Sequence, residues 1–218
     1  MHEWQEFSIF ENESGICIAF VTFIPMNNTA NLENSISAII SLTEAELALF
    51  FSFLEPLSLK KNDFFLEEGK VCSYIGFINS GVLIYYKSTD KGNEVTTDFA
   101  FENEWVTNNQ SRLLQAPSLI NIKAIEPTEL LVIQNKNLSE LYLSIPKIER
   151  LGRILMEYAY IRIARHSIDL QVFSAKERYE KLLERYPEIL QRVSLYHIAN
   201  YLGIAPKSLS RIRNEMFR

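Results

Sequence analysis

Five cationic or hydroxyl side chains near the C-terminal end of this 218-residue chain are spaced to face outward from one short helix. They are Lys207, Ser208, Ser210, Arg211 and Arg213. Such groups hydrogen-bond to phosphate oxygens and to base edges, and a short helix fits the major groove of double-stranded DNA. Arg211, Lys207 and Ser208 are therefore candidates for base contacts. We expect Ser210, Arg213 and Ser194 to contact phosphates instead.

The residues around these side chains predict a helix, a tight turn and a second helix. Ser194 suits the N-cap of the first helix, because its hydroxyl can accept a hydrogen bond from a free backbone N–H. Gly203 can take the left-handed backbone that ends a helix, and Pro206 fits the first turn of the next one. Ala199 leaves room for a close helix crossing. The apolar positions should form the buried seam: Leu195, Ile198, Leu202, Ile204, Leu209 and Ile212.

Charge is divided unevenly along the chain. Residues 147–218 carry 14 Lys and Arg against 8 Asp and Glu, whereas residues 1–146 carry 8 against 19. The net charge of −5 therefore hides a basic C-terminal third. A basic segment that coincides with a helix-turn-helix pattern indicates a nucleic-acid partner. The alternative is a helical segment whose Lys and Arg side chains are simply solvated.

The sequence shows no pattern typical of an enzyme or of a metal site. It has no Gly-x-Ser-x-Gly, no phosphate-binding loop and no Gly-x-Gly-x-x-Gly. Cys17 and Cys72 are 55 residues apart, which argues against zinc, an iron–sulfur cluster or a disulfide framework. We therefore expect no catalytic residue, no metal and a reducing, cytoplasmic location.

Residues 1–30 form an N-terminal extension whose role the sequence leaves open. Its apolar run, residues 16–24, is shorter than the roughly 20 residues that span a bilayer, and its flank is acidic, unlike a signal peptide. We expect no membrane association. The run is either a strand that covers a sheet edge or part of a stretch upstream of a true start at Met26.

Residues 31–145 predict a β-rich domain. Thr43 is placed to cap a helix, with Glu44 and Glu46 in its first turn. Short extended segments then alternate with turns from Leu57 to Ile133, including a hairpin turn at residues 90–93. Strands of this length and spacing are typical of a β-sandwich or a barrel-like roll.

A long helix, residues 146–172, is expected next, and about 25 helical residues at 1.5 Å each would be about 38 Å long. Four apolar positions recur at spacings of 3 and 4: Ile148, Leu151, Leu155 and Tyr158. A neighbouring stripe contains Ile154, Ile161 and Ile168. A heptad-like stripe on a long helix indicates packing against a second chain. The alternative is a helix packed only on its own domain. A break at residues 173–174 marks the expected start of the DNA-binding domain, residues 173–218.

The order of these segments resembles the Crp/Fnr-type transcription regulators, over about residues 40–218. The motifs that carry the resemblance are Glu68-Gly69, residues 77–81, Glu104, Ile198-Ala199, Leu202-Gly203 and residues 208–211. The resemblance implies an α+β fold with a jelly-roll-like double-stranded β-roll, a dimerisation helix and a winged-helix-like helix-turn-helix domain. Few residues follow Arg213, so we expect the wing to be reduced or absent.

The resemblance also implies an effector pocket at Asn103, Glu104, Ser118 and Leu119. In nucleotide-binding members an arginine clamps the cyclic phosphate, and Ser118 occupies the corresponding position here. Because a cyclic phosphate needs a cation or several N–H donors, we expect a ligand other than cyclic AMP. A cyclic-nucleotide response is the alternative. We expect no iron–sulfur cluster, because the two cysteines are too few and too far apart, and no haem, since His166 and His197 are isolated on predicted helices.

We therefore interpret the chain as a homodimeric, sequence-specific regulator of transcription. Its partners would be double-stranded DNA, a second copy of the chain and an unidentified small-molecule effector, with RNA polymerase as a further candidate. An alternative interpretation is that the chain is a protein-interaction module with a cyclic-nucleotide-like domain, whose helix-turn-helix contacts another protein instead of DNA.

Overall fold

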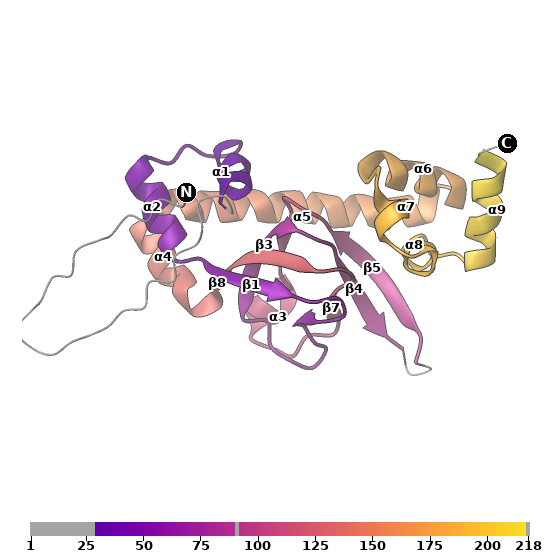
Figure 1. Cartoon of the computed structure of the whole chain (residues 1–218), viewed down its shortest axis with the longest axis horizontal. Coiled ribbons are helices and arrows are strands. Elements are labelled where there is room, and N and C mark those ends of the chain that lie inside the picture. The colour runs from indigo at the N-terminus through magenta and orange to yellow at the C-terminus, as the bar shows by residue number, and fades with distance from the viewer. Residues whose placement is uncertain (1–28, 90–91, 217–218) are drawn as a thin grey trace, which may run out of the picture.

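The computed structural model describes residues 29–89 and 92–216. Nearly all of the N-terminal extension and two residues of the predicted hairpin turn at 90–93 lie outside these ranges. A β-roll lies between two groups of helices, and one long helix, α5 (Pro146–Val172), runs along it (Figure 1). The expected α+β architecture is confirmed.

Three helices cover one end of the roll: α1 (Ala30–Ser37), α2 (Glu44–Ser52) and α4 (Leu138–Ser144). Helix α2 begins where the sequence predicts it, because Thr43 and Glu46 form a reciprocal capping box. Helix α1 was not predicted, and its buried residues Leu32 and Ile36 join the core beneath these helices. A short 3-10 helix, η2 (Asn135–Asn137), leads into α4.

The roll consists of two four-stranded antiparallel sheets. The first contains, in order, β1 (Glu55–Leu59), β8 (Thr128–Gln134), β3 (Tyr74–Ser80) and β6 (Trp105–Val106). The second contains β2 (Phe64–Leu66), β7 (Asn121–Ala124), β4 (Leu83–Ser88) and β5 (Glu94–Ala100). Gly81, at the predicted turn between β3 and β4, has φ +101°, and a Cβ there would lie 2.3 Å from Thr128 Oγ1. Only glycine fits that turn. The sequence did not predict β6 or the following helix α3 (Asn109–Leu114).

Helix α5 begins at Pro146 and has the predicted length, but its buried face differs from the expected dimer face. Ile148 and Leu151 are 5% and 2% exposed and are packed, with Leu155 beside them, in the chain's own core. Ile148 and Leu151 are thus covered by the chain's own side chains, Leu155 is partly buried, and Tyr158, the fourth residue of the expected dimer face, is 61% exposed. An outward-facing stripe on α5 combines Tyr158 with the predicted neighbouring stripe, and we call it the α5 stripe: Ile154, Tyr158, Ile161, Arg165, Ile168 and Val172.

Four helices form the other end of the molecule: α6 (Ala175–Arg185), α7 (Ile189–Arg192), α8 (Leu195–Tyr201) and α9 (Pro206–Met216). Ser174 and Ser194 cap α6 and α8 by accepting hydrogen bonds from the backbones of Glu177 and His197, and Gly203 has φ +67°. Residues 173–216 contain no strand. The predicted helix, turn and helix are therefore confirmed.

These four helices share a hydrophobic core with the roll. The roll contributes side chains from β4, β5 and their flanks: Val82, Ile84, Tyr86, Phe99 and Phe101. The helices contribute residues such as Tyr179, Ile198 and Leu209. The break at residues 173–174 therefore divides the elements into two groups along the chain, but the two groups share one hydrophobic core.

Candidate nucleic-acid interface and effector pocket

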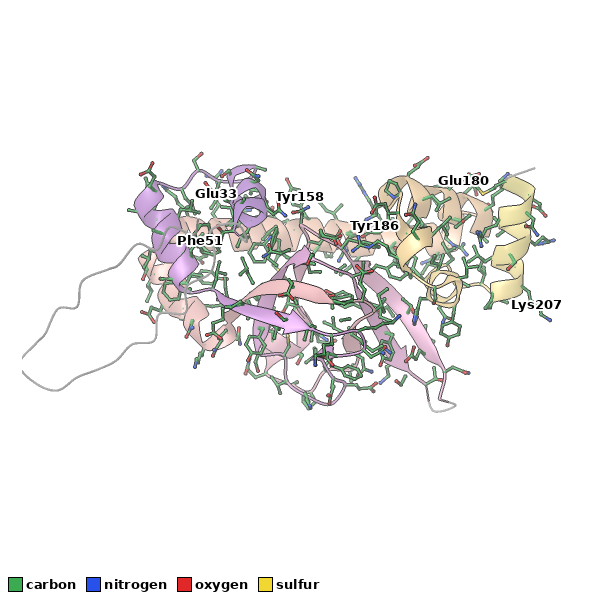
Figure 2. All side chains as sticks on the ribbon, viewed as in Figure 1. Glu33, Phe51, Tyr158, Glu180, Tyr186 and Lys207 are labelled. Atoms are coloured by element: carbon green, nitrogen blue, oxygen red, sulfur yellow. The ribbon has the colours of Figure 1, made fainter. Side chains whose placement is uncertain are left out.

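Helix α9 presents the predicted polar face to solvent. Lys207, Ser210 and Arg211 are exposed, with 77% of the Arg211 side chain accessible, and Ser208 is half-buried. Figure 2 shows Lys207 at the end of α9, pointing away from the body of the molecule. Ser210 donates its hydroxyl hydrogen to the Pro206 carbonyl at 3.1 Å. Three of the predicted DNA contacts thus lie on one open helix face.

Two further predicted contacts, Ser194 and Arg213, are placed differently. Ser194 is exposed, but its hydroxyl oxygen already accepts the His197 N–H at the start of α8. Arg213 is half-buried beside Tyr179, and its Nε is buried. Burial raises the pKa of Tyr179, and the charge of Arg213 opposes that rise. Arg213 therefore supports the α6–α9 packing as well as lying on the recognition helix.

Local contacts fix the angle between α8 and α9. The Ile204 N–H donates to the Ala199 carbonyl at 3.0 Å, across the turn that contains Gly203. The guanidinium of Arg178 donates to the backbone oxygens of Phe173 (2.6 Å) and Leu202 (2.8 Å). Arg178 therefore ties the end of α5 to the turn of the helix-turn-helix. No spacing in the sequence indicated this role.

Polar contacts also join the helix-turn-helix to strand β5. The Tyr196 hydroxyl and the Asn200 amide both donate to the Glu94 carbonyl, at 3.1 and 3.0 Å. His197 Nδ1 lies 2.9 Å from Thr96 Oγ1. Burial lowers the pKa of His197, and Lys123 lowers it further, whereas Glu94 acts in the opposite direction. These contacts hold α8 against the roll.

The four residues expected to form the effector pocket line neither of the two cavities described below. Ser118 is buried, and its hydroxyl is bound to the Asn108 amide (2.9 Å) and the Ile120 carbonyl (2.6 Å). Leu119 is 58% exposed. Asn103 occupies a left-handed turn, with φ +66°. Glu104 accepts a hydrogen bond from the Tyr186 hydroxyl at 3.2 Å, so it faces α6.

A cavity of about 730 Å³ lies instead between the roll and α5, and we call it the roll–helix cavity. Much of its wall is apolar, with Trp105, Leu138 and Leu155 among the lining residues. A polar group near α8 consists of Asp98 and Arg162, paired at 2.9 Å, and His166. Burial raises the pKa of the Asp98 carboxyl although the Arg162 charge opposes the rise. None of the four expected pocket residues lines this cavity.

The roll–helix cavity reaches from the sensor strands to the helix-turn-helix. Tyr201, the last residue of α8, lines it together with His166 of α5, and their rings stack at 4.6 Å between centroids. Tyr201 also contacts Phe99 of β5, at 5.0 Å between ring centroids. A molecule in this cavity would therefore touch the roll, the long helix and the helix-turn-helix at once.

Two further features bear on the class of site. Within residues 29–89 and 92–216, no helix is both long and apolar enough to cross a bilayer. In the same part of the chain, no three His, Cys, Asp or Glu residues are grouped so that they could hold a metal ion.

The class of fold is an antiparallel double-sheet roll followed by a long helix and a helix-turn-helix. Residues 56–144, less than half of the chain, match the family model of the cyclic nucleotide-binding domain. The name describes the family and does not by itself assign a nucleotide ligand. No curated protein sequence matches the chain.

Solved structures of Crp/Fnr regulators share the architecture of the chain. FixK2 from Bradyrhizobium japonicum is 16% identical, with a TM-score of 0.66 over 75% of this chain and 84% of its own. The c-di-GMP-responsive global regulator CLP of Xanthomonas campestris is 14% identical, with a TM-score of 0.63 over 80% and 91%. A transcriptional regulator of the Crp/Fnr family from Eubacterium rectale is 20% identical, with a TM-score of 0.60 over 78% and 82%. At these identities the likeness establishes the fold, which is that of the Crp/Fnr regulators.

Proposed function

We propose that the protein is a homodimeric, sequence-specific DNA-binding regulator of transcription whose β-roll responds to a small molecule. The observation that carries the proposal is the open face of α9, where Lys207, Ser210 and Arg211 are exposed on the second helix of a helix-turn-helix. This helix is the one that enters the major groove in helix-turn-helix proteins. The regulators that share the fold support a role in regulation and not in catalysis.

The α5 stripe supports dimerisation. Its members recur at spacings of 4, 3, 4, 3 and 4, which is a heptad pattern, and they lie away from the core that holds Ile148 and Leu151. Ile161 and Ile168 are 44% and 56% exposed. An apolar stripe of this length on the surface of one chain is expected to be covered by a second copy. Two copies would present two α9 helices to successive major grooves, about 34 Å apart.

The roll–helix cavity is the proposed effector site. Its volume of about 730 Å³ is large enough for a metabolite, and it joins Asp98 of β5, Arg162 of α5 and Tyr201 of α8. A ligand that binds one arrangement of these elements more tightly than another would shift the orientation of the helix-turn-helix. The Ser118 hydroxyl, at the expected phosphate position, is uncharged and already hydrogen-bonded, which favours an effector other than cyclic AMP.

Selection of bound fragments from a random pool of duplex DNA tests the proposal. The purified protein should enrich a near-palindromic site whose half-site centres are about one helical turn apart, as two α9 helices require. Enrichment of a single half-site would support DNA binding but contradict the dimer. Recovery of no sequence above background, at low salt and with a library of metabolites added, would contradict the proposed function.

A further inference from the structure

A second cavity, of about 420 Å³, lies between α5 and the helices α6 and α8. We call it the basic cavity because its lining includes five cations: Arg162, Arg165, Arg178, Lys181 and Arg185. Asp169 is the one carboxylate among its described lining residues. We propose that the basic cavity binds a small phosphate monoester attached to a planar ring. Arg162, His166 and Tyr201 line both this cavity and the roll–helix cavity. The site goes beyond the proposed function, since it takes a ligand of its own and binding here requires no DNA.

The surrounding carboxylates leave part of the positive charge unmatched. Arg162 pairs with Asp98 and Lys181 pairs with Asp169, each at 2.9 Å. Arg185 lies 3.6 Å from Glu104, which is a long ion pair. The five cations therefore line a cavity whose wall contains one carboxylate, Asp169, while Asp98, Glu104 and Glu177 lie beside it. A wall of this net positive charge favours an anion such as a phosphate monoester, which carries about −1.5 to −2 at neutral pH.

Two of the five cations have no carboxylate partner. The Arg178 guanidinium donates to two backbone carbonyls, which are uncharged. Arg165 is exposed and forms no hydrogen bond or ion pair with any residue of 29–89 or 92–216. An arginine of this kind can bind two oxygens of one phosphate through parallel N–H groups. These side chains are therefore available to an anion without first losing a partner.

The positions of the cations on two helices make them converge. Arg178, Lys181 and Arg185 are spaced by 3 and 4 on α6, so they share one face of that helix. Arg162 and Arg165 are spaced by 3 on α5. Because both sets line the same cavity, a single anion between the two helices can contact both.

The remaining wall suits the ring of the ligand. Tyr158 and Tyr201 contribute aromatic rings, and Ile161, Leu182 and Leu202 contribute apolar surface. His166 stacks on Tyr201, which holds that ring in place. Aromatic side chains stack on planar heterocycles, while the guanidinium groups take the phosphate. The chemistry of the cavity thus fits a molecule with a dianionic end and a planar end.

Titration calorimetry on the full chain without DNA tests the proposal, with adenosine 5′-monophosphate as the probe. Heat of binding is expected with the probe and not with adenosine, which lacks the phosphate, or with cyclic AMP, which carries one charge. Arg165→Gln and Arg185→Gln should each weaken binding by about tenfold or more, as the loss of a charge-assisted hydrogen bond implies. Arg150→Gln is the matched control, since Arg150 is exposed on α5 and lines neither cavity.

Three outcomes would overturn the proposal. They are no heat with adenosine 5′-monophosphate, equal heat with adenosine, or an affinity loss in Arg150→Gln as large as in the two cavity variants. Because Tyr158, Ile161 and Arg165 of the cavity wall also belong to the α5 stripe, the oligomeric state of Arg165→Gln is measured by ultracentrifugation. If that variant dissociates, Arg185→Gln, which lies outside the stripe, decides the result. DNA retention of the same proteins is scored separately, so failure here leaves the DNA-binding proposal intact.

Discussion

Arg192 and Glu102 form a two-point ion pair, with Nη1···Oε2 at 2.8 Å and Nη2···Oε1 at 2.5 Å. The same guanidinium also binds the Glu126 carboxylate. Arg192 ends α7, just before the helix-turn-helix, whereas the two carboxylates lie beside strands β5 and β8 of the roll. Although burial acts to raise the pKa of Glu102, the hydrogen bonds from Arg192 and the Gly81 N–H lower it below its ordinary value. The pair therefore fixes the C-terminal helices to the roll.

Replacement of this arginine should weaken the junction. Arg192→Met leaves two partly buried carboxylates without their cation, and we expect the free energy of unfolding to fall by about 1–3 kcal/mol. Urea denaturation followed by circular dichroism measures the change. Arg153→Met is the control, because the exposed Arg153–Glu157 pair should contribute less than about 1 kcal/mol. Equal losses in the two variants would contradict a fixing role for Arg192.

The His197–Thr96 contact predicts that stability depends on pH. Burial lowers the pKa of His197 from the ordinary value of 6.5, so below that pH the unfolded chain binds more protons than the folded one. The contribution of neutral His197 is complete above about pH 6.5 and is lost as the pH falls toward the lowered pKa.

His197→Gln isolates this effect. The stability advantage of the wild-type protein over the variant should shrink as the pH falls from about 8 to about 5.5. His166, whose pKa burial also lowers, is present in both proteins and cancels in the difference. Urea midpoints measured across this range give the comparison. An advantage that stays constant or grows toward low pH would show that His197 is not held neutral at the junction.

The α5 stripe predicts which substitutions produce a monomer. Ile161→Glu places a charge within the proposed interface, so the dimer dissociation constant should rise more than tenfold, which corresponds to at least about 1.4 kcal/mol. Tyr160→Glu is the control, because Tyr160 is exposed on the same helix but outside the stripe. Sedimentation equilibrium measures the dimer dissociation constant of each variant. A wild-type protein that is monomeric at all concentrations, or a variant Ile161→Glu that stays dimeric, would rule out this face.

Cyclic AMP should leave the melting temperature unchanged at about millimolar concentration. The reason is that Ser118 supplies no cation, while the arginines that line the roll–helix cavity already have partners: Arg112 contacts Asn109, Arg153 pairs with Glu157 and Arg162 pairs with Asp98. Differential scanning fluorimetry with and without cyclic AMP measures the melting temperature. The selected DNA fragment serves as the positive control, since a ligand of the folded state must raise the melting temperature. A clear upward shift with cyclic AMP would assign the nucleotide as a ligand.

The parts of the fold that depend on neighbouring residues could be predicted from the sequence. Thr43, Ser174 and Ser194 cap helices within three residues of themselves, and Gly203 with Pro206 sets the turn of the helix-turn-helix. By contrast, neighbouring residues could not predict which face of α5 is buried. Both stripes have spacings of 3 and 4, and only the packing of α4 and the roll decides that Ile148 is inside.

The candidate effector site could not be predicted for a related reason. Glu104 is bound by Tyr186, 82 residues away in sequence, and Asp98 pairs with Arg162 across the roll–helix cavity. Neither partnership has a local sequence pattern. The two-residue strand β6 is also too short to produce a periodic signal, although it positions Trp105 at the cavity wall.

The salt dependence of DNA binding by the wild-type protein and Arg211→Ala tests the central claim most directly. Fluorescence anisotropy with the selected site should show an affinity that falls steeply with salt, because phosphate contacts release counterions. Arg211→Ala should lose about 1–3 kcal/mol on the selected site and less on unrelated DNA, and Lys176→Ala, on α6, should change little. Failure of the intact protein to bind any duplex at low salt, or an affinity that does not change with salt, would contradict the account.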